Sequence, residues 1–88
     1  MYEIILSPDA EKSLAKLSRS DRKLFGQVAR ALDQLAENPL LGKFLMDNLK
    51  GYHSYRVRDY RILYEIENAT LRVLVLRIQH RKEVYRTN

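Results

Sequence analysis

The spacing of hydrophobic residues changes once along this chain, near residue 50, and this change constrains its fold most. Before it, apolar residues recur every three to four positions, which is the period of one face of an α-helix. After it, aromatic and β-branched residues gather in short runs that are typical of β-strands. Since 88 residues can build only one core, we expect a single domain over residues 1–88. Helices and strands segregated in one domain indicate the α+β class.

The first half predicts one strand and a helical hairpin. Residues 2–6 are strand formers, and Ser7-Pro8 is typical of an N-cap followed by proline at the first helical position. The first helix loses its apolar spacing at residues 18–20, so we expect Ser20 to cap a second helix. Asn38-Pro39 should end that helix, because proline cannot continue one.

The second half predicts an antiparallel sheet. We expect three strands there, at Tyr52–Val57, Tyr60–Glu67 and 71–78. The intervening Arg58 and Asp59 have the length of a hairpin loop. The run 71–78 is apolar apart from two arginines, which favours a strand buried on both faces at the centre of the sheet. Residues 40–49 should form a loop with one irregular turn at most, and residues 79–88 a short tail.

The net charge of +5 lies entirely in the second half. Residues 1–49 carry seven basic and seven acidic residues, whereas residues 50–88 carry nine basic and four acidic residues. A basic excess confined to one part of a domain points to a polyanion, and nucleic acid is the first candidate. The sequence has no cysteine, which excludes disulfides and thiolate metal sites, and its apolar runs are too short for a signal peptide or a membrane span. We therefore expect a soluble cytoplasmic protein.

A two-residue loop fixes which hairpin residues face one another. Arg56 then lies opposite Arg61, and the alternate positions form the packing face of the sheet. That packing face comprises His53, Tyr55, Val57, Tyr60, Ile62 and Tyr64. Like charges directly opposite one another destabilise a strand pair, and an anion between them would resolve the conflict. Guanidinium groups suit a phosphate because they stay charged and offer planar forks to its oxygens. The alternative is a pair of solvated arginines with Glu65 as a partner.

Further candidates follow the run 71–78. We expect Arg77 and Arg81 to approach the same edge, and Arg58 to add long-range attraction from the turn. His80 is the residue best suited to exchange a proton near neutral pH, with a structural, hydrogen-bonded role as the alternative. Tyr85 could stack on a base or bind a phosphate.

Other chemistries fail for want of the necessary residues. The sequence has no glycine-rich phosphate loop and no cysteine nucleophile. His53 and His80 are far apart and have no local acid cluster, so we expect no metal site and no cofactor. A metal-free basic site can still cleave RNA, because the 2′-hydroxyl of RNA can attack the adjacent phosphate while the protein orients the chain and neutralises charge.

Three stretches resemble the RelE family of the RelE/ParE toxin superfamily. They are residues 49–51 (LKG), 55–66 (YRVRDYRILYEI) and 80–86 (HRKEVYR). The resemblance implies a β-α-α-β-β-β RelE-like fold, with a helical hairpin packed on a small, mainly antiparallel sheet. It also implies a toxin of a type II toxin–antitoxin system that cleaves mRNA in the ribosomal A site and is neutralised by a cognate antitoxin.

Carried over by position, the resemblance implies four catalytic residues. Arg61 matches the arginine that stabilises the phosphate transition state, and Arg81 matches a second arginine for the leaving group or phosphate. Tyr85 matches a tyrosine that orients the substrate, and His80 matches the general acid of the YoeB branch. The glutamate base of that branch has no counterpart, since Lys43 and Phe44 stand in that region.

The expected substrate-binding residues are Lys50, Arg56, Arg58 and Arg77. Arg56, and less closely Arg58, stand where well-known members carry lysines implicated in proton abstraction and charge stabilisation. Many members have glycine at the position of Arg58, where a tight turn favours positive φ.

Taken with the resemblance, these residues predict a metal-independent endoribonuclease toxin that acts on ribosome-bound mRNA. The leading alternative is a ParE-like inhibitor of DNA gyrase on the same fold, without nuclease activity. A third interpretation is an RNA-binding module that uses the same basic surface without catalysis.

Overall fold

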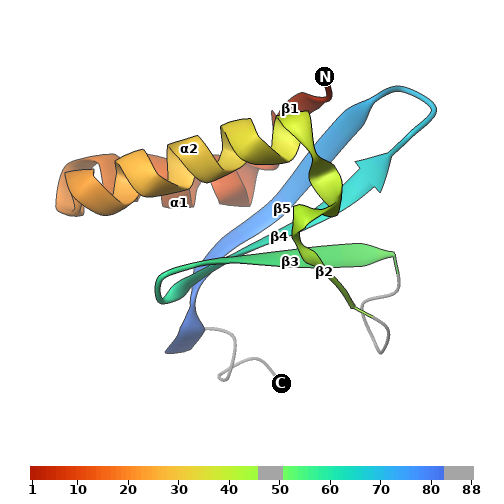
Figure 1. Ribbon diagram of the computed structural model, residues 1–88. Coiled ribbons are helices and arrows are strands. Elements are labelled where there is room, and N and C mark those ends of the chain that lie inside the picture. Colours follow the sequence, from red (N-terminus) through yellow and green to blue (C-terminus); the bar gives the residue numbers. More distant parts are fainter. Residues whose placement is uncertain (46–50, 83–88) are drawn as a thin grey trace.

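Two helices cover one face of a five-stranded sheet in the computed structural model, which describes residues 1–45 and 51–82 (Figure 1). The elements are β1 (Glu3–Leu6), α1 (Pro8–Ser20), α2 (Arg22–Glu37), the 3-10 turn η1 (Pro39–Leu41), β2 (Lys43–Leu45), β3 (Tyr52–Val57), β4 (Tyr60–Glu67) and β5 (Arg72–His80). The strand order is β1-β5-β4-β3-β2, and among the described residues β1 with β5 is the one parallel pair. The α+β class and the helical hairpin on a mainly antiparallel sheet are confirmed. No helix in the described ranges is long and apolar enough to cross a membrane.

The two helices are joined by one residue, Asp21. At the start of α1, Ser7 accepts a hydrogen bond from the backbone N–H of Ala10, as expected of an N-cap. The prediction that Ser20 caps α2 is wrong, because α1 continues through Ser20, whose hydroxyl donates to the carbonyl of Lys16. Asp21 is the cap instead, since its carboxylate accepts from the N–H of Leu24 and its own N–H donates to Leu17 at the end of α1.

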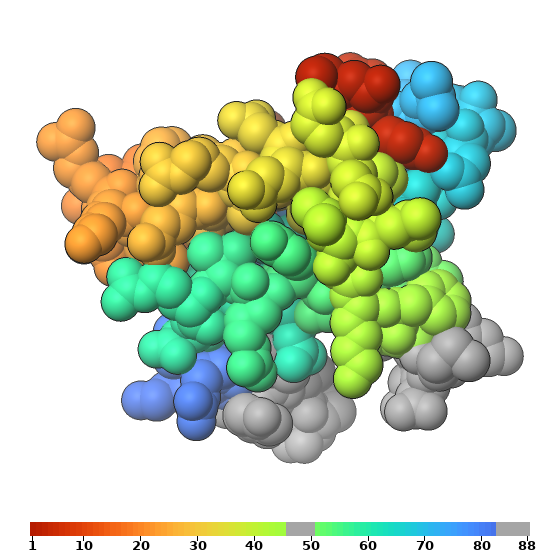
Figure 2. Space-filling model, in the orientation of Figure 1, coloured from red at the N-terminus to blue at the C-terminus, as the bar shows by residue number. Residues whose placement is uncertain are grey.

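A short fifth strand lies where the sequence predicts a loop. Residues 39–41 form η1, and β2 pairs antiparallel with β3, which places Lys43 opposite Ser54 and Phe44 opposite His53. The Tyr64 hydroxyl donates to the carbonyl of Pro39 at 2.6 Å and accepts from the N–H of Gly42 at 3.0 Å. Figure 2 shows this segment in yellow-green between α2 and the green strands. A strand of three residues is too short to show an alternating pattern, so periodicity could not reveal it.

The β3–β4 hairpin has the expected two-residue loop and register. Arg56 lies opposite Arg61, and Val57 opposite Tyr60. Arg58 adopts φ 55°, in the left-handed region that glycine tolerates best. The backbone thus holds an arginine in a conformation that favours glycine.

The strand β5 is longer and less buried than predicted. It continues through Gln79 and His80, which the sequence places in a tail. Val73, Val75 and Ile78 are buried, but the residues between them are partly or fully exposed, because helices cover only one face of the sheet. The central strand is β4, so the predicted central position of β5 is also wrong.

The sheet therefore has two distinct faces. The helix-side face carries Tyr55, Val57, Tyr60, Ile62 and Tyr64 together with His53, and these side chains pack with the apolar sides of α1 and α2. The opposite side, here called the outer face, carries the alternate residues of the same strands. The predicted packing face is confirmed.

Candidate nucleic-acid interface

A row of polar residues crosses the outer face near the β3–β4 turn. The register places Arg56 beside Arg61 and Arg61 beside Gln79 of β5, so three adjacent strands contribute to the row. Arg56 is exposed, and Arg61 and Gln79 are half-buried. In residues 1–45 and 51–82, neither arginine of this row forms an ion pair. Glu65 lies opposite Tyr52, four residues along β4 from Arg61. It is therefore too far away to neutralise the arginine pair.

A second row on the outer face adds a lysine that the sequence does not identify as a site residue. Lys43 of β2 lies beside Ser54, which lies beside Leu63, and Leu63 lies beside Arg77. Only the pairing of β2 with β3 places Lys43 on this face. Diagonal neighbours on adjacent strands are about 7–8 Å apart, so the Lys43 side chain is long enough to reach the level of Arg56.

Charge changes sign along the outer face. The end near the β3–β4 turn carries Arg56 and Arg61, whereas the opposite end carries Glu65 and Glu67. At that opposite end Arg72 pairs with Glu3 at 3.7 Å. A polyanion would therefore be attracted to the turn end and repelled from the other.

The backbone places Arg81 next to the hairpin turn. Its N–H donates to the carbonyl of Asp59 at 2.7 Å, which fixes the end of β5 against the turn that contains Arg58. Both arginines are exposed. In the described residues, the turn end of the sheet thus has four arginines: Arg56 of β3, Arg61 of β4, Arg58 in the turn and Arg81 directly after β5.

The structure does not bring His80 together with the arginine pair. His80 lies opposite Tyr60 in the register, on the helix-side face, and its ring meets the ring of Tyr60 edge to face at 5.3 Å. Its Nδ1 accepts a hydrogen bond from the N–H of Lys82 at 3.1 Å. His80 and Tyr60 help to line a cavity of about 330 Å³ that also touches the α1–α2 junction at Asp21.

His53 lies in the packing face, as the sequence predicts, but its buried Nδ1 has no hydrogen-bond partner among the described residues. Its side chain is 9% exposed, stacked on Tyr64 at 5.3 Å and tilted against Phe44 at 5.0 Å. Burial lowers the pKa of His53 from its ordinary value of 6.5. Burial also raises the pKa of Tyr64, whose hydroxyl is a hydrogen-bond donor to Pro39.

Comparison with known proteins identifies the family. A protein-family model described as "ParE toxin of type II toxin-antitoxin system, parDE" matches residues 4–85. The sequence is 36% identical over 86 residues to Toxin RelG of Mycobacterium tuberculosis, with 97% of each chain covered. The chain belongs to the RelE/ParE toxin superfamily. This toxin is also 31% identical over 93 residues to Toxin RelE of the same species, covering 99% of this chain and 89% of the other.

A solved structure supports the same assignment of the toxin. The chain is similar to one in the crystal structure of the toxin–antitoxin complex RelBE2 from M. tuberculosis, with a TM-score of 0.80 and 31% sequence identity. The similarity covers 90% of this chain and 96% of that one. The toxin therefore has the RelE-like fold that the three sequence stretches imply.

The structure locates the arginines that the sequence predicts as site residues. Arg61 lies beside Arg56 at the turn end of the outer face, and Arg81 lies next to the turn. Arg77 lies beside Leu63 on the neighbouring strand β5, and it forms an ion pair with Asp9 at 3.4 Å. The predicted site residues Lys50 and Tyr85 lie outside the described residues.

Proposed function

We propose that this toxin is a ribosome-dependent, metal-independent mRNA endoribonuclease that cleaves in the A site. The observation that carries the proposal is the opposition of Arg56 and Arg61 on the sheet face that points away from the helices, with no acidic partner in the described parts of the chain. Such an arrangement is unfavourable without an anion, and two adjacent guanidinium forks match phosphate oxygens.

In the proposed reaction the nucleophile comes from the RNA, so the protein needs only to position the phosphate, neutralise charge and assist proton transfer. The 2′-hydroxyl of RNA attacks the adjacent phosphorus, the bond to the 5′-oxygen of the next nucleotide breaks, and the products are a 2′,3′-cyclic phosphate and a 5′-hydroxyl. Arg56 and Arg61 hold the phosphate and neutralise the charge that develops on its oxygens, with Arg81 contributing from beside the turn. Proton transfer by His80 requires the RNA to pass around the turn end of the sheet, because His80 lies on the other face.

The proposed partners are mRNA on the ribosome and a cognate antitoxin. The relative RelBE2 is a toxin–antitoxin complex by its description, and its toxin shares this fold. The basic end of the outer face supplies attraction to RNA that should weaken as the salt concentration rises.

The test is cleavage of mRNA on programmed ribosomes, read as new 5′ ends. The double variant Arg61→Ala plus Arg81→Ala should lose cleavage, whereas Arg72→Ala should retain it, because Arg72 lies at the opposite end of the outer face in an ion pair with Glu3. EDTA should have no effect apart from damage to the ribosome, which replacement of magnesium would reverse. Full cleavage by the double variant would overturn the proposal.

Inhibition of DNA gyrase is the second candidate, and the family model favours it because its description names a ParE toxin. Induction of the toxin separates the two functions. A nuclease should arrest translation and create new mRNA 5′ ends, whereas a gyrase inhibitor should produce gyrase-dependent DNA breaks with intact mRNA. RNA binding without either effect would instead indicate a module without catalysis.

A further inference from the structure

A shallow groove of about 720 Å³ lies on the outer face, next to the arginine row. Tyr52 of β3, Leu63 of β4 and Leu76 with Arg77 of β5 line it, and residues 7–9 at the start of α1 complete its rim. Leu63 is two residues from Arg61 on one strand, a separation of about 7 Å. That separation is within the length of one nucleotide, so one RNA chain can occupy both places.

A β-bulge forms the groove. Leu63 pairs with Arg77 and the next residue, Tyr64, pairs with Val75, so Leu76 is an extra residue in β5. Since a bulge interrupts the alternation of side chains, Leu76 and Arg77 can line the same groove although they are consecutive. Bulges are frequent beside functional sites, where they redirect a side chain.

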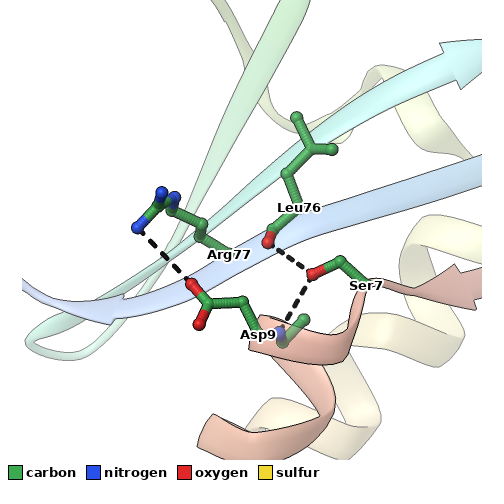
Figure 3. Close-up of polar contacts among 5 residues, drawn as sticks. Ser7, Asp9, Leu76 and Arg77 are labelled. Atoms are coloured by element: carbon green, nitrogen blue, oxygen red, sulfur yellow. Dashed lines mark hydrogen bonds and ion pairs between the residues drawn. The ribbon is translucent and has the colours of Figure 1, made fainter.

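Ser7 holds the bulge in place (Figure 3). Its hydroxyl donates to the carbonyl of Leu76 at 2.6 Å and accepts from the N–H of Ala10 at 3.0 Å. Its own N–H donates to the carbonyl of Val75 at 2.9 Å. The cap of α1 and the bulge of β5 are therefore one hydrogen-bonded unit.

The surface chemistry of the groove suits a flat, partly apolar ligand with a polar edge. Tyr52 offers an aromatic ring, and Leu63 and Leu76 offer apolar surface. At the rim, Arg77 supplies hydrogen-bond donors and Asp9 supplies acceptors, 3.4 Å from each other. Both side chains are more than half exposed, so their ion pair contributes little stability and can exchange for contacts with a ligand.

We propose that this groove binds a nucleobase of the RNA chain whose phosphate is held by Arg56 and Arg61. The base lies against Tyr52 and the two leucines, and its hydrogen-bonding edge meets Arg77 and Asp9. This inference rests on the proposed function, and it makes the groove a determinant of which base is accepted beside the cleaved bond. Aromatic stacking supplies affinity for any base, whereas an arginine and a carboxylate distinguish bases by their donors and acceptors.

Binding is tested without cleavage by NMR titration of the full chain with AMP, GMP, CMP and UMP. Resonances of Tyr52, Leu63 and Leu76 should shift on saturation. Tyr52→Ala should weaken the binding of all four nucleotides by about five- to a hundredfold, whereas Tyr52→Phe should retain it. Shifts confined to residues outside the groove would overturn the inference.

The matched pair Arg77→Gln and Arg72→Gln tests discrimination between bases. Each arginine lies on β5 and forms one exposed ion pair with an acid from the start of the chain, but only Arg77 lines the groove. Arg77→Gln should change the ratio between the best and the worst nucleotide by about fivefold or more, and Arg72→Gln should leave it unchanged. Thermal unfolding of both variants shows whether each remains folded, and Asp9→Asn against Glu3→Gln repeats the comparison from the acidic side.

Cleavage on ribosomes whose A-site codons differ in one base gives the second readout. Arg77→Gln should reorder the kcat/KM values among codons, whereas Arg72→Gln should reproduce the wild-type order. An unchanged order in Arg77→Gln, with wild-type cleavage intact, would overturn the groove inference alone. Absence of cleavage by the wild-type toxin would overturn the nuclease proposal, and the nucleotide titrations would still decide whether the groove binds a base.

Discussion

The two faces of the sheet are built from the same strands and have opposite character. On the helix-side face, Ile62 and Tyr64 are fully buried beneath α1 and α2. On the outer face, one residue earlier, Arg61 lies beside Arg56 with no acid to neutralise the pair in the described residues. Because side chains alternate along a strand, a single stretch of eight residues in β4 contributes to both the core and the candidate site.

This difference shows where stability is given up for binding. On the helix-side face the buried Tyr64 hydroxyl makes two hydrogen bonds, although the buried Nδ1 of His53 has no hydrogen-bond partner among the described residues. The outer face instead opposes two like charges, which destabilises the isolated toxin and favours a bound anion. Substitutions on the two faces should therefore affect different quantities, stability on one and RNA cleavage on the other.

The largest effect on stability is expected from Ile62→Ala. Ile62 is fully buried at the centre of the helix-side face, and its truncation leaves a cavity in the core. The free energy of unfolding should fall by about 2–5 kcal/mol, measured by urea denaturation. A decrease of less than about 0.5 kcal/mol would show that packing of the helices on this face contributes little to the stability of the fold.

The neighbouring substitution Arg61→Ala should leave stability almost unchanged and reduce cleavage. Removal of one of two opposed charges should change the free energy of unfolding by no more than about 0.5 kcal/mol. The kcat/KM for mRNA on programmed ribosomes should fall by about 10²–10³-fold, as when one preorganised donor to a developing charge is removed. Arg72→Ala is the control, and equal losses in the two variants would contradict the assignment of the site to the turn end.

Local patterns in the sequence predicted most of this architecture. The hairpin register was readable because two long alternating runs flank a loop of two residues, and Ser7-Pro8 marks the start of α1 by its cap chemistry. The cap of α2 was assigned one residue early because serine and aspartate at residues 20 and 21 are both good caps, and only the backbone shows which one ends α1.

The remaining features depend on contacts between distant segments. The strand β2 is positioned by its pairing with β3 and by Tyr64, more than twenty residues away in sequence. Counted from Val75 without an extra residue, Arg77 would lie on the helix-side face and His80 on the outer face. The bulge at Leu76 reverses both placements, so Arg77 lies on the outer face and His80 on the helix-side face. No local pattern in the sequence identifies either contact.

Among the stability effects, Tyr64→Phe should have the second largest, because it weakens the attachment of the segment that carries Lys43. The substitution keeps the ring in the core but removes a donor to Pro39 and an acceptor for Gly42. We expect a loss of about 1–3 kcal/mol in the free energy of unfolding, because both backbone groups lose a partner. Hydrogen exchange should quicken at residues 42–45 while the amides of β4 and β5 stay protected, and uniform quickening would contradict a local role.

Acidification should act on the helix-side face through His53. Burial lowers the pKa of His53, so below the ordinary value of 6.5 the unfolded chain binds a proton that the folded chain resists. The free energy of unfolding should therefore decrease as the pH falls below about 6.5, by at most about 1.4 kcal/mol per pH unit. Urea denaturation between pH 5 and 7.5 measures the slope, and His53→Phe should remove it while keeping a ring beside Tyr64 and Phe44. An identical slope in the variant would assign the effect to other groups.

A small effect on cleavage is expected from His80→Asn, and this variant tests the division between the faces most directly. Asparagine places its side-chain oxygen near the position of Nδ1, so it can keep the hydrogen bond from the N–H of Lys82 while losing the imidazole. Because His80 lies beside Tyr60 on the helix-side face, we expect kcat/KM to fall by less than about tenfold, well below the 10²–10⁴-fold contribution of a general acid or base. A fall of 10²-fold or more, together with loss of the alkaline limb of the pH–rate profile, would show that the RNA reaches around the turn end and that His80 transfers the proton. In that case both faces of the sheet would contribute to one active site, with the β3–β4 turn between the phosphate-binding and proton-transfer groups.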